Sequence, residues 1–227
     1  MKPPPHSPVV AVFVRVPVPG RVKTRLAAVL GADGACRLYQ AMVTDILGNI
    51  QACGLPLYLF HDGTEQSALP PAWVAAATQV IVQQGEGLGE RMAAAFEHCF
   101  AENIPQVVLV GSDIPGLDGP IIKKAAAALA VADGALVPVV DGGYCLIALQ
   151  RQRYRRRLFQ EIPWSTDQVL RVTLQRFQEC HLTLSLQAAL QDIDTPDDVQ
   201  RYCGRPCAQA LATNRVLQQL REEGSGG

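Results

Sequence analysis

Residues 9–26, VVAVFVRVPVPGRVKTRL, join an apolar run to a basic loop, and the helix-forming segment LAAVL begins at the end of that loop. The run Val9–Val14 is rich in β-branched residues, as is typical of a strand buried on both faces of a sheet. The loop after it contains proline, glycine and four cationic side chains, which are Arg15, Arg21, Lys23 and Arg25. A buried strand that ends in such a loop is a common phosphate-binding arrangement in α/β proteins. The stretch therefore predicts a phosphate-binding loop near the start of an α/β chain.

Strand and helix patterns alternate along the rest of the chain. Strands are expected at residues 55–61, 79–82, 106–110, 135–140, 144–149 and 182–186, and helices at 31–52, 87–100, 121–132 and 166–180. Ser165 and Gln168 are placed as a capping box for the helix at 166–180, and Thr195 is placed as the N-cap of a helix that begins with Pro196. This alternation predicts a mostly parallel sheet with helices on both faces.

The length and composition limit the kinds of protein that the chain can be. Its 227 residues are enough for one large domain. We expect a flexible, proline-rich N-terminus at 1–8, a single domain at 9–204, and a C-terminal helix with a flexible tail at 205–227.

Charge, hydropathy and cysteine usage exclude several classes of function. The net charge of −1 argues against a protein that coats nucleic acid, and no apolar run is long enough to span a membrane. The seven cysteines are odd in number and scattered, as expected for reduced thiols in a cytoplasmic protein.

The basic loop offers several groups suited to phosphate. Gly20 permits close approach of the backbone, Lys23 and Arg25 supply charge-assisted hydrogen bonds, and Arg15 adds a further cation. The alternative is a solvated loop whose cations only keep the chain soluble. Four cations within eleven residues favour the phosphate hypothesis. The loop lacks the G-x-x-x-x-G-K-[ST] pattern, so it is not a Walker loop.

Two acidic positions follow predicted strands in distant parts of the chain. Asp113 comes directly after the strand at 106–110, and Asp194 precedes the helix that begins at Pro196. Two carboxylates that converge on one Mg²⁺ would leave coordination positions open for substrate phosphates. Asp113 could instead cap a turn, and Asp194 could instead complement the dipole of the following helix.

Two glycine-containing segments have both a functional and a structural interpretation. In GEGLGER, residues 85–91, Gly87 and Gly89 could lie against a base or a ribose, or could form a plain tight turn. Asp141, in DGGY, lies between two predicted strands, where an Asp-Gly hairpin turn is the favoured interpretation. A carboxylate that faces an acceptor substrate is the alternative.

Six segments together resemble a known family. PVPGRVKTRL, GEGLGERM, VLVGSDIPGL, PVVDGGYCLIAL, IPWST and DIDTPDDV occur in the order found in bacterial transferase-like proteins of the GT-A, nucleotide-diphospho-sugar transferase superfamily. Some members are glycosyltransferases associated with radical-SAM or arsenosugar gene neighbourhoods. The resemblance covers roughly residues 9–202, and its specificity comes from the combination of segments.

The resemblance implies a Rossmann-like three-layer α/β/α sandwich that has a mostly parallel mixed sheet and binds a nucleotide diphosphate. Asp113 stands at the position of the superfamily's metal-binding acid, and Asp194 at that of a second metal ligand in related nucleotidyltransferases. Lys23 and Arg25 fall in the loop that holds the phosphates. This chain has Arg15 where members usually carry lysine. PGRVKTR replaces the common G-x-G-x-R-M-G loop, so that loop's pyrophosphate contacts do not carry over.

The leading hypothesis is an enzyme, dependent on Mg²⁺ or Mn²⁺, that moves a sugar from a nucleotide-diphosphate sugar to a small acceptor. Lys23, Arg25 and the metal would neutralise the departing diphosphate. Asp141 is the candidate for positioning or deprotonating the acceptor. One alternative is a guanylyltransferase-like nucleotidyltransferase that releases pyrophosphate from a nucleoside triphosphate. Another is a non-catalytic nucleotide-binding module.

Overall fold

The computed structural model describes residues 8–63 and 68–225. All but one residue of the N-terminal segment that we expect to be flexible lie outside this range. The last two residues of the expected C-terminal tail do so as well.

A single sheet of seven strands forms the middle layer, in the order β3-β2-β1-β4-β6-β5-β7. The strands are β1 (Val9–Val14), β2 (Leu57–His61), β3 (Gln79–Val82), β4 (Gln106–Val110), β5 (Gly134–Pro138), β6 (Tyr144–Gln150) and β7 (Leu184–Leu186). The strand β6 pairs antiparallel with both β4 and β5, and every other pairing in the sheet is parallel. The mostly parallel, mixed sheet that the sequence predicts is therefore confirmed.

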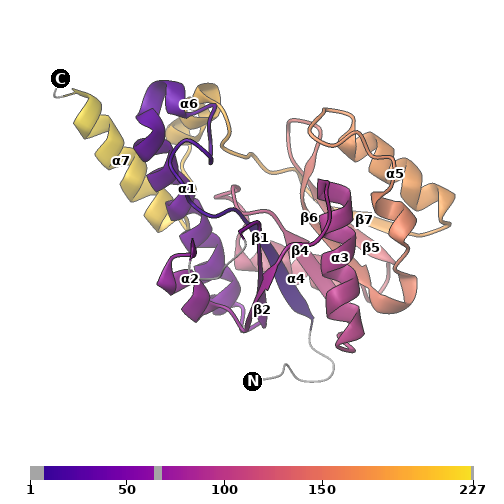
Figure 1. The fold of residues 1–227 in the computed structure, drawn as a ribbon. Coiled ribbons are helices and arrows are strands. Elements are labelled where there is room, and N and C mark those ends of the chain that lie inside the picture. Colours follow the sequence, from indigo (N-terminus) through magenta and orange to yellow (C-terminus); the bar gives the residue numbers. More distant parts are fainter. Residues whose placement is uncertain (1–7, 64–67, 226–227) are drawn as a thin grey trace.

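Helices cover both faces of this sheet (Figure 1). The α-helices are α1 (Ala27–Ala52), α2 (Pro71–Ala76), α3 (Leu88–Ala101), α4 (Gly119–Ala128), α5 (Val169–Glu179), α6 (Pro196–Gly204) and α7 (Leu211–Ser225), and two short 3₁₀ helices span Arg151–Arg153 and Arg156–Phe159. One core cluster joins the sheet to α1, α4 and α7, and a second joins its other face to α3 and α5. The fold is thus the Rossmann-like α/β/α sandwich that the sequence predicts.

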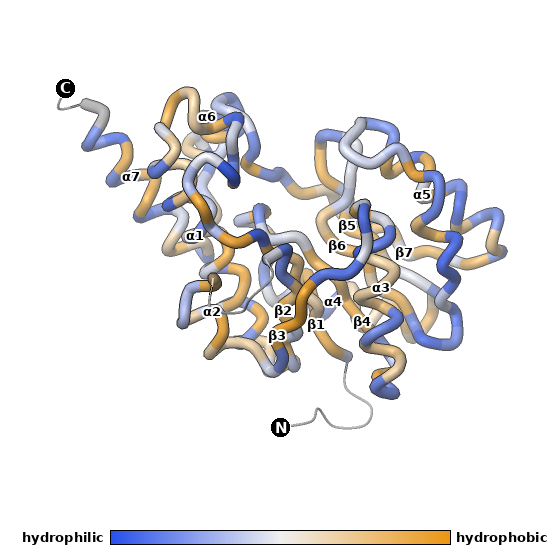
Figure 2. Tube along the Cα trace, viewed as in Figure 1, coloured by the Kyte–Doolittle hydropathy of each residue, from blue (hydrophilic) through white to orange (hydrophobic). Residues whose placement is uncertain are grey.

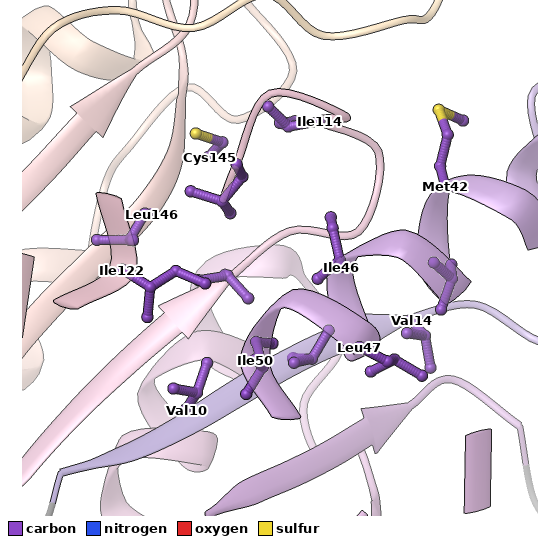
Figure 3. Packing of buried hydrophobic residues seen from close by; sticks show 14 of the residues in the cluster. Val10, Val14, Met42, Ile46, Leu47, Ile50, Ile114, Ile122, Cys145 and Leu146 are labelled. Carbon is purple, nitrogen blue, oxygen red and sulfur yellow. The ribbon is translucent and has the colours of Figure 1, made fainter. Parts of the chain in front are cut away.

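The apolar run at β1 supplies both cores. Val10, Val12 and Val14 belong to the cluster beneath α1, and Val9 and Ala11 face the opposite cluster. Successive side chains of a strand point to opposite faces, so a central strand needs apolar residues at every position. Figure 3 shows Val10 and Val14 among residues of α1, and Figure 2 shows the hydrophobic colouring of the central strands.

The C-terminal helix α7 packs along α1 (Figure 1). The Asp45 carboxylate accepts hydrogen bonds from the backbone N–H groups of Ala212 and Thr213, at 2.9 and 2.8 Å. A carboxylate near the N-terminus of a helix satisfies amides that lack an intrahelical partner. Further along, Arg37 forms an ion pair with Glu223 at 2.9 Å.

Most predicted elements are confirmed within a few residues, and one predicted cap is wrong. The helix α5 begins at Val169, and its N-cap residue, Gln168, makes no side-chain capping bond. The expected capping box with Ser165 therefore does not form. Instead, the carbonyl oxygen of Gly142 accepts from the N–H of Leu170 at 2.8 Å, so a neighbouring loop satisfies this end of the helix.

The other helix start singled out in the sequence is confirmed. Thr195 caps α6, and the side chain of Asp198 bonds back to the Thr195 backbone in a capping box. The helix α4 begins earlier than expected because Asp118 caps it by accepting from the N–H of Ile121 at 3.0 Å.

The direction of the strands decides where the functional loops gather. Since β1, β2, β3, β4, β5 and β7 run the same way, the segments after their carboxyl ends lie at one edge of the sheet. Ligands of open α/β sheets bind beyond this edge.

Candidate active site

A cavity of about 560 Å³ lies at this edge of the sheet. The residues that line it follow four neighbouring strands and include Arg15, Arg21, Lys23, Thr24 and Arg25 after β1, Asp62 after β2, Gln83, Glu86 and Arg91 after β3, and Ser112 and Asp113 after β4. Asp194, far along the chain, completes the lining. The cavity therefore combines five cationic and four acidic side chains.

The ammonium group of Lys23 lies between two carboxylates at the bottom of this cavity. Its Nζ is 2.9 Å from Oδ2 of Asp113 and 3.3 Å from Oδ1 of Asp194. The side chain of Lys23 is only 5% exposed, whereas each carboxylate is about two-fifths exposed. Burial alone would lower the pKa of Lys23, but the two carboxylates outweigh it and raise that pKa. Lys23 is thus charged in the folded protein.

The backbone of the basic loop is held in an unusual conformation at Lys23. Its φ is 48°, a left-handed value that is uncommon outside glycine and that clusters at functional sites. Val22 and Leu26, on either side, are buried in the core and anchor the loop. Gly20 has a φ of 78°, which accounts for glycine at that position, but it is not among the residues that line the cavity.

Arg25 extends this ionic network. Its guanidinium donates to Oδ2 of Asp194 at 3.1 Å and is largely exposed to the cavity mouth. Asp194 therefore faces two cations and makes no capping bond to α6. Thr195 caps this helix, and Asp198 completes the capping box. Although burial opposes its ionisation, hydrogen bonds from Thr195 and Arg201 lower the pKa of Asp198 to about 2.

The hydroxyl of Tyr39 joins the loops that follow β1 and β4. It accepts from the backbone N–H of Arg15 at 2.7 Å and lies 3.3 Å from Oγ of Ser112. Asp62 joins the loops that follow β2 and β1, because its carboxylate accepts from the backbone N–H of Val16 at 2.8 Å. Neither role is predicted by the sequence. Tyr39 sits within the apolar pattern of a helix and Asp62 within an Asp-Gly turn, so neither had a signal of its own.

Asp141 lies outside the cavity lining, in the hairpin between β5 and β6. Its Oδ1 accepts from the N–H of Gly143 at 3.0 Å, which confirms the hairpin-turn interpretation of this segment. The charge of Asp141 nevertheless affects another carboxyl group, that of Asp192. Burial raises the pKa of Asp192 to about 6, and the charges of Asp141 and Asp113 push it in the same direction.

Gly87 and Gly89 line a second, more open cavity of about 810 Å³ beside the start of α3. Gly87 is the N-cap of α3, and Gly89 packs against Trp164. A Cβ at Gly89 would lie 2.6 Å from Nε1 of Trp164, so only glycine fits there. Leu88, between these two glycines, and Glu86, just before Gly87, line the first cavity.

The acidic groups suit a hard divalent cation. Asp113 and Asp194 approach a single positive atom from different parts of the chain, and carboxylate oxygens are the ligands that Mg²⁺ and Mn²⁺ prefer. Over residues 8–63 and 68–225, no group of three or more His, Cys, Asp or Glu side chains is arranged as a metal site. A pair of carboxylates fits a cation that keeps its other positions for phosphate and water.

A family model described as "Uncharacterized protein conserved in bacteria (DUF2064)" matches residues 48–166, which is more than half of the chain. The chain belongs to the DUF2064 family. No curated protein matches the sequence of this DUF2064 protein.

Solved structures similar to this DUF2064 protein share its fold. One, described as a "putative nucleotide-diphospho-sugar transferase" from Desulfovibrio desulfuricans G20, is 29% identical, with a TM-score of 0.83 over 95% of this chain and 98% of the other. A 4-diphosphocytidyl-2C-methyl-D-erythritol synthase from Anaerococcus prevotii DSM 20548 is 10% identical, with a TM-score of 0.56 over 89% of this chain and all of the other. A cytidylyltransferase from Leptospira borgpetersenii is 12% identical, with a TM-score of 0.54 over 97% and 96% of the chains. The last two show a shared fold alone.

The structure also describes the helices and the cysteines of this DUF2064 protein. In the part of the chain that the structure describes, no helix is both long and apolar enough to cross a bilayer. All seven cysteines lie in that part and none is in a disulfide, as expected for reduced thiols.

Proposed function

We propose that this DUF2064 protein is a metal-dependent transferase that moves a sugar from a nucleotide-diphosphate sugar to a small acceptor. The donor's diphosphate would bind in the cavity beyond β1 and β4. Similarity to the Desulfovibrio desulfuricans G20 structure over nearly both chains supports a substrate of the nucleotide-sugar class.

One observation carries the proposal. The Lys23 ammonium, 5% exposed, lies between the Asp113 and Asp194 carboxylates in a cavity that three further arginines from the same loop and its start also line. A cation that is buried, charged and already paired is pre-positioned, so it needs little reorganisation when a phosphate arrives. A loop of cations needed only for solubility would not bury one of them against two acids.

The residues of the cavity would share the work of charge stabilisation. Lys23 would donate to phosphate oxygens from below, and Arg25 would donate from the exposed side. Asp113 and Asp194 would hold Mg²⁺ or Mn²⁺, which would supply further positive charge at the departing diphosphate. Asp141 remains our candidate for positioning the acceptor, because its charge, like that of Asp113, raises the pKa of Asp192.

The test separates the reaction types by their products. The purified protein is incubated with UDP-glucose or with GTP, with Mg²⁺ and a mixture of small alcohols and hydroxy acids, and the products are measured by mass spectrometry. Sugar transfer predicts release of nucleoside diphosphate. Release of pyrophosphate would support the nucleotidyltransferase alternative, and binding without turnover of either nucleotide would support a non-catalytic module.

Two variants with a matched control test whether Asp113 and Asp194 hold the metal. Asp113→Asn and Asp194→Asn should each weaken Mn²⁺-dependent UDP binding, measured by calorimetry, by tenfold or more. Asp197→Asn, which changes an exposed aspartate three residues from Asp194 that does not line the cavity, should leave it unchanged. Equal binding by all three variants would remove the metal assignment.

A further inference from the structure

A small apolar recess of about 120 Å³ opens beside the main cavity. The side chains that matter for its chemistry are Phe13 from β1, Leu88 and Met92 from α3, Tyr144 from β6 and Trp164. None of them carries a charge. The recess differs in this from the main cavity, where charged side chains predominate.

The recess shares part of its lining with the proposed phosphate site. Phe13, Leu88 and Gly111 line both hollows. Gly111 is two residues from Asp113, and a Cβ at Gly111 would lie 3.5 Å from Oδ1 of that aspartate. The part of the recess wall at Gly111 therefore lies near the carboxylate of Asp113.

The aromatic wall of the recess is fixed in place. The rings of Tyr144 and Trp164 meet edge to face, with centroids 6.2 Å apart. The absence of a side chain at Gly89 lets Trp164 pack directly on α3, where a Cβ would lie 2.6 Å from its Nε1. A wall held from two sides keeps its shape when the recess is filled.

Leu88 lies at the boundary between the two hollows and is 43% exposed, although it is a large apolar residue. A compact apolar group entering the recess would remove this surface from water. A cavity of about 150 Å³ lined by aliphatic and aromatic residues accepts benzene, so the recess suits a group of about four to six carbons. A sugar is a poor occupant, because its hydroxyls would lose hydrogen bonds to water without replacement.

We propose that this recess binds a compact alkyl or aryl group of the acceptor substrate, next to the donor's diphosphate. The inference rests on the proposed function, since it takes the neighbouring cavity to be the donor site. It makes the acceptor a small molecule with an apolar end, and it makes Leu88 and Met92 determinants of acceptor specificity.

The test uses fluorobenzene as the probe of the recess and UDP with Mg²⁺ as the probe of the donor site. Binding of fluorobenzene to the full chain is followed by ¹⁹F NMR, with and without saturating UDP. We expect millimolar binding that persists when UDP is bound. The variants Leu88→Trp, which closes the mouth, and Met92→Phe, which fills the recess from within, should each weaken fluorobenzene binding at least tenfold.

Matched controls keep the result specific. Leu211→Trp makes the same change at an exposed leucine of α7, outside both hollows, and should leave fluorobenzene binding unchanged. UDP affinity should stay within twofold in Met92→Phe, because Met92 lines the recess and is not among the residues that line the main cavity. Circular dichroism verifies that both variants are folded. Absence of fluorobenzene binding, equal binding by all variants, or displacement of fluorobenzene by UDP would overturn the proposal. Failure of UDP to bind the unaltered protein would instead contradict the proposed function, while Leu88-dependent binding of fluorobenzene would still support an apolar subsite.

Discussion

Nζ of Lys23 lies 2.9 Å from Oδ2 of Asp113, although ninety positions separate the two residues in the sequence. The contact joins the loop after β1 to the loop after β4, which are neighbours in the sheet. Lys23 is thus a counter-cation, supplied by the protein itself, for the carboxylates of Asp113 and Asp194.

Replacing Lys23 should therefore have opposite effects on two ligands. In Lys23→Met, we expect UDP affinity in the presence of Mg²⁺ to fall by about 10- to 100-fold, because a hydrogen bond to a charged group is worth about 1.5–3 kcal/mol. Mn²⁺ affinity without nucleotide, measured by electron paramagnetic resonance, should rise, because Asp113 and Asp194 lose their own counter-cation. Lys124→Met, on the exposed side of α4, should change neither affinity. A fall in Mn²⁺ affinity in Lys23→Met would contradict this account of the pair.

Removing the hydroxyl of Tyr39 should loosen the cavity as well as destabilise the fold. Tyr39→Phe leaves the Arg15 N–H without its 2.7 Å acceptor, so we expect a loss of about 1–2 kcal/mol in urea unfolding and a several-fold weaker affinity for UDP. Tyr202→Phe is the matched control, since it removes a 2.8 Å hydrogen bond to Asn214 far from the cavity. It should cost similar stability and leave UDP affinity unchanged. Equal UDP affinity in both variants would show that Tyr39 is only structural.

His61 should make the protein less stable in mild acid. Its side chain is 1% exposed, and burial lowers its pKa although the charge of Asp62 opposes this. The unfolded chain therefore takes up a proton at a pH where the folded one does not, and stability falls as the pH drops below about 6.5. The slope should not exceed about 1.4 kcal/mol per pH unit.

The variant His61→Leu tests the source of that slope. Urea unfolding at pH 5 to 8 should show a shallower dependence than in the unaltered protein. An unchanged slope in His61→Leu would assign the pH dependence to other groups.

Glycine should be required at Gly89 and dispensable at Gly87. In Gly89→Ala the new Cβ would meet the carbonyl oxygen of Phe159 at 2.5 Å and Nε1 of Trp164 at 2.6 Å. We expect a loss of about 1–3 kcal/mol in thermal or urea unfolding, as for other overpacked sites. Gly87→Ala meets nothing within 4 Å and should cost less than 1 kcal/mol, the cost of a weaker N-cap. Comparable losses in the two variants would argue against the packing explanation.

The fold could be predicted from the sequence because its signals are local. The apolar run at β1, the short strand at β4 and the amphipathic α3 each carry a clear periodicity, and their alternation implies the layered sheet. The short helix α2 was not predicted, since six residues give too little periodicity. The cap at Ser165 was predicted wrongly because the partner of Leu170 comes from a distant loop, at Gly142.

Some residues of the candidate site are likewise predicted from the sequence, and others are not. Lys23 and Asp113 lie in the loops after β1 and β4, and the topology brings these loops together because the two strands are neighbours. Asp194 follows β7, at the far edge of the sheet, and it reaches them through the segment before α6, where the N–H of Ile193 donates to the carbonyl oxygen of Asp113 at 3.3 Å. Tyr39 and Asp62 act through contacts 24 and 46 positions apart, made by residues whose local patterns have ordinary explanations. The apolar recess had no sequence signal, because its walls come from five separate segments of core-like residues.

The basic loop and the apolar wall of the recess come from different parts of the sheet, and the antiparallel strand β6 contributes to the wall. Its neighbours bring their carboxyl ends to the ligand edge, whereas β6 brings its amino end. Tyr144 and the hairpin with Asp141 therefore lie at the same edge, where the N–H of Gly111 donates to the carbonyl oxygen of Cys145. The basic loop belongs to the strands at the start of the chain, and the apolar wall belongs to this later hairpin and to Trp164. Substitutions around the hairpin would therefore alter the apolar wall over evolutionary time while leaving the basic loop unchanged.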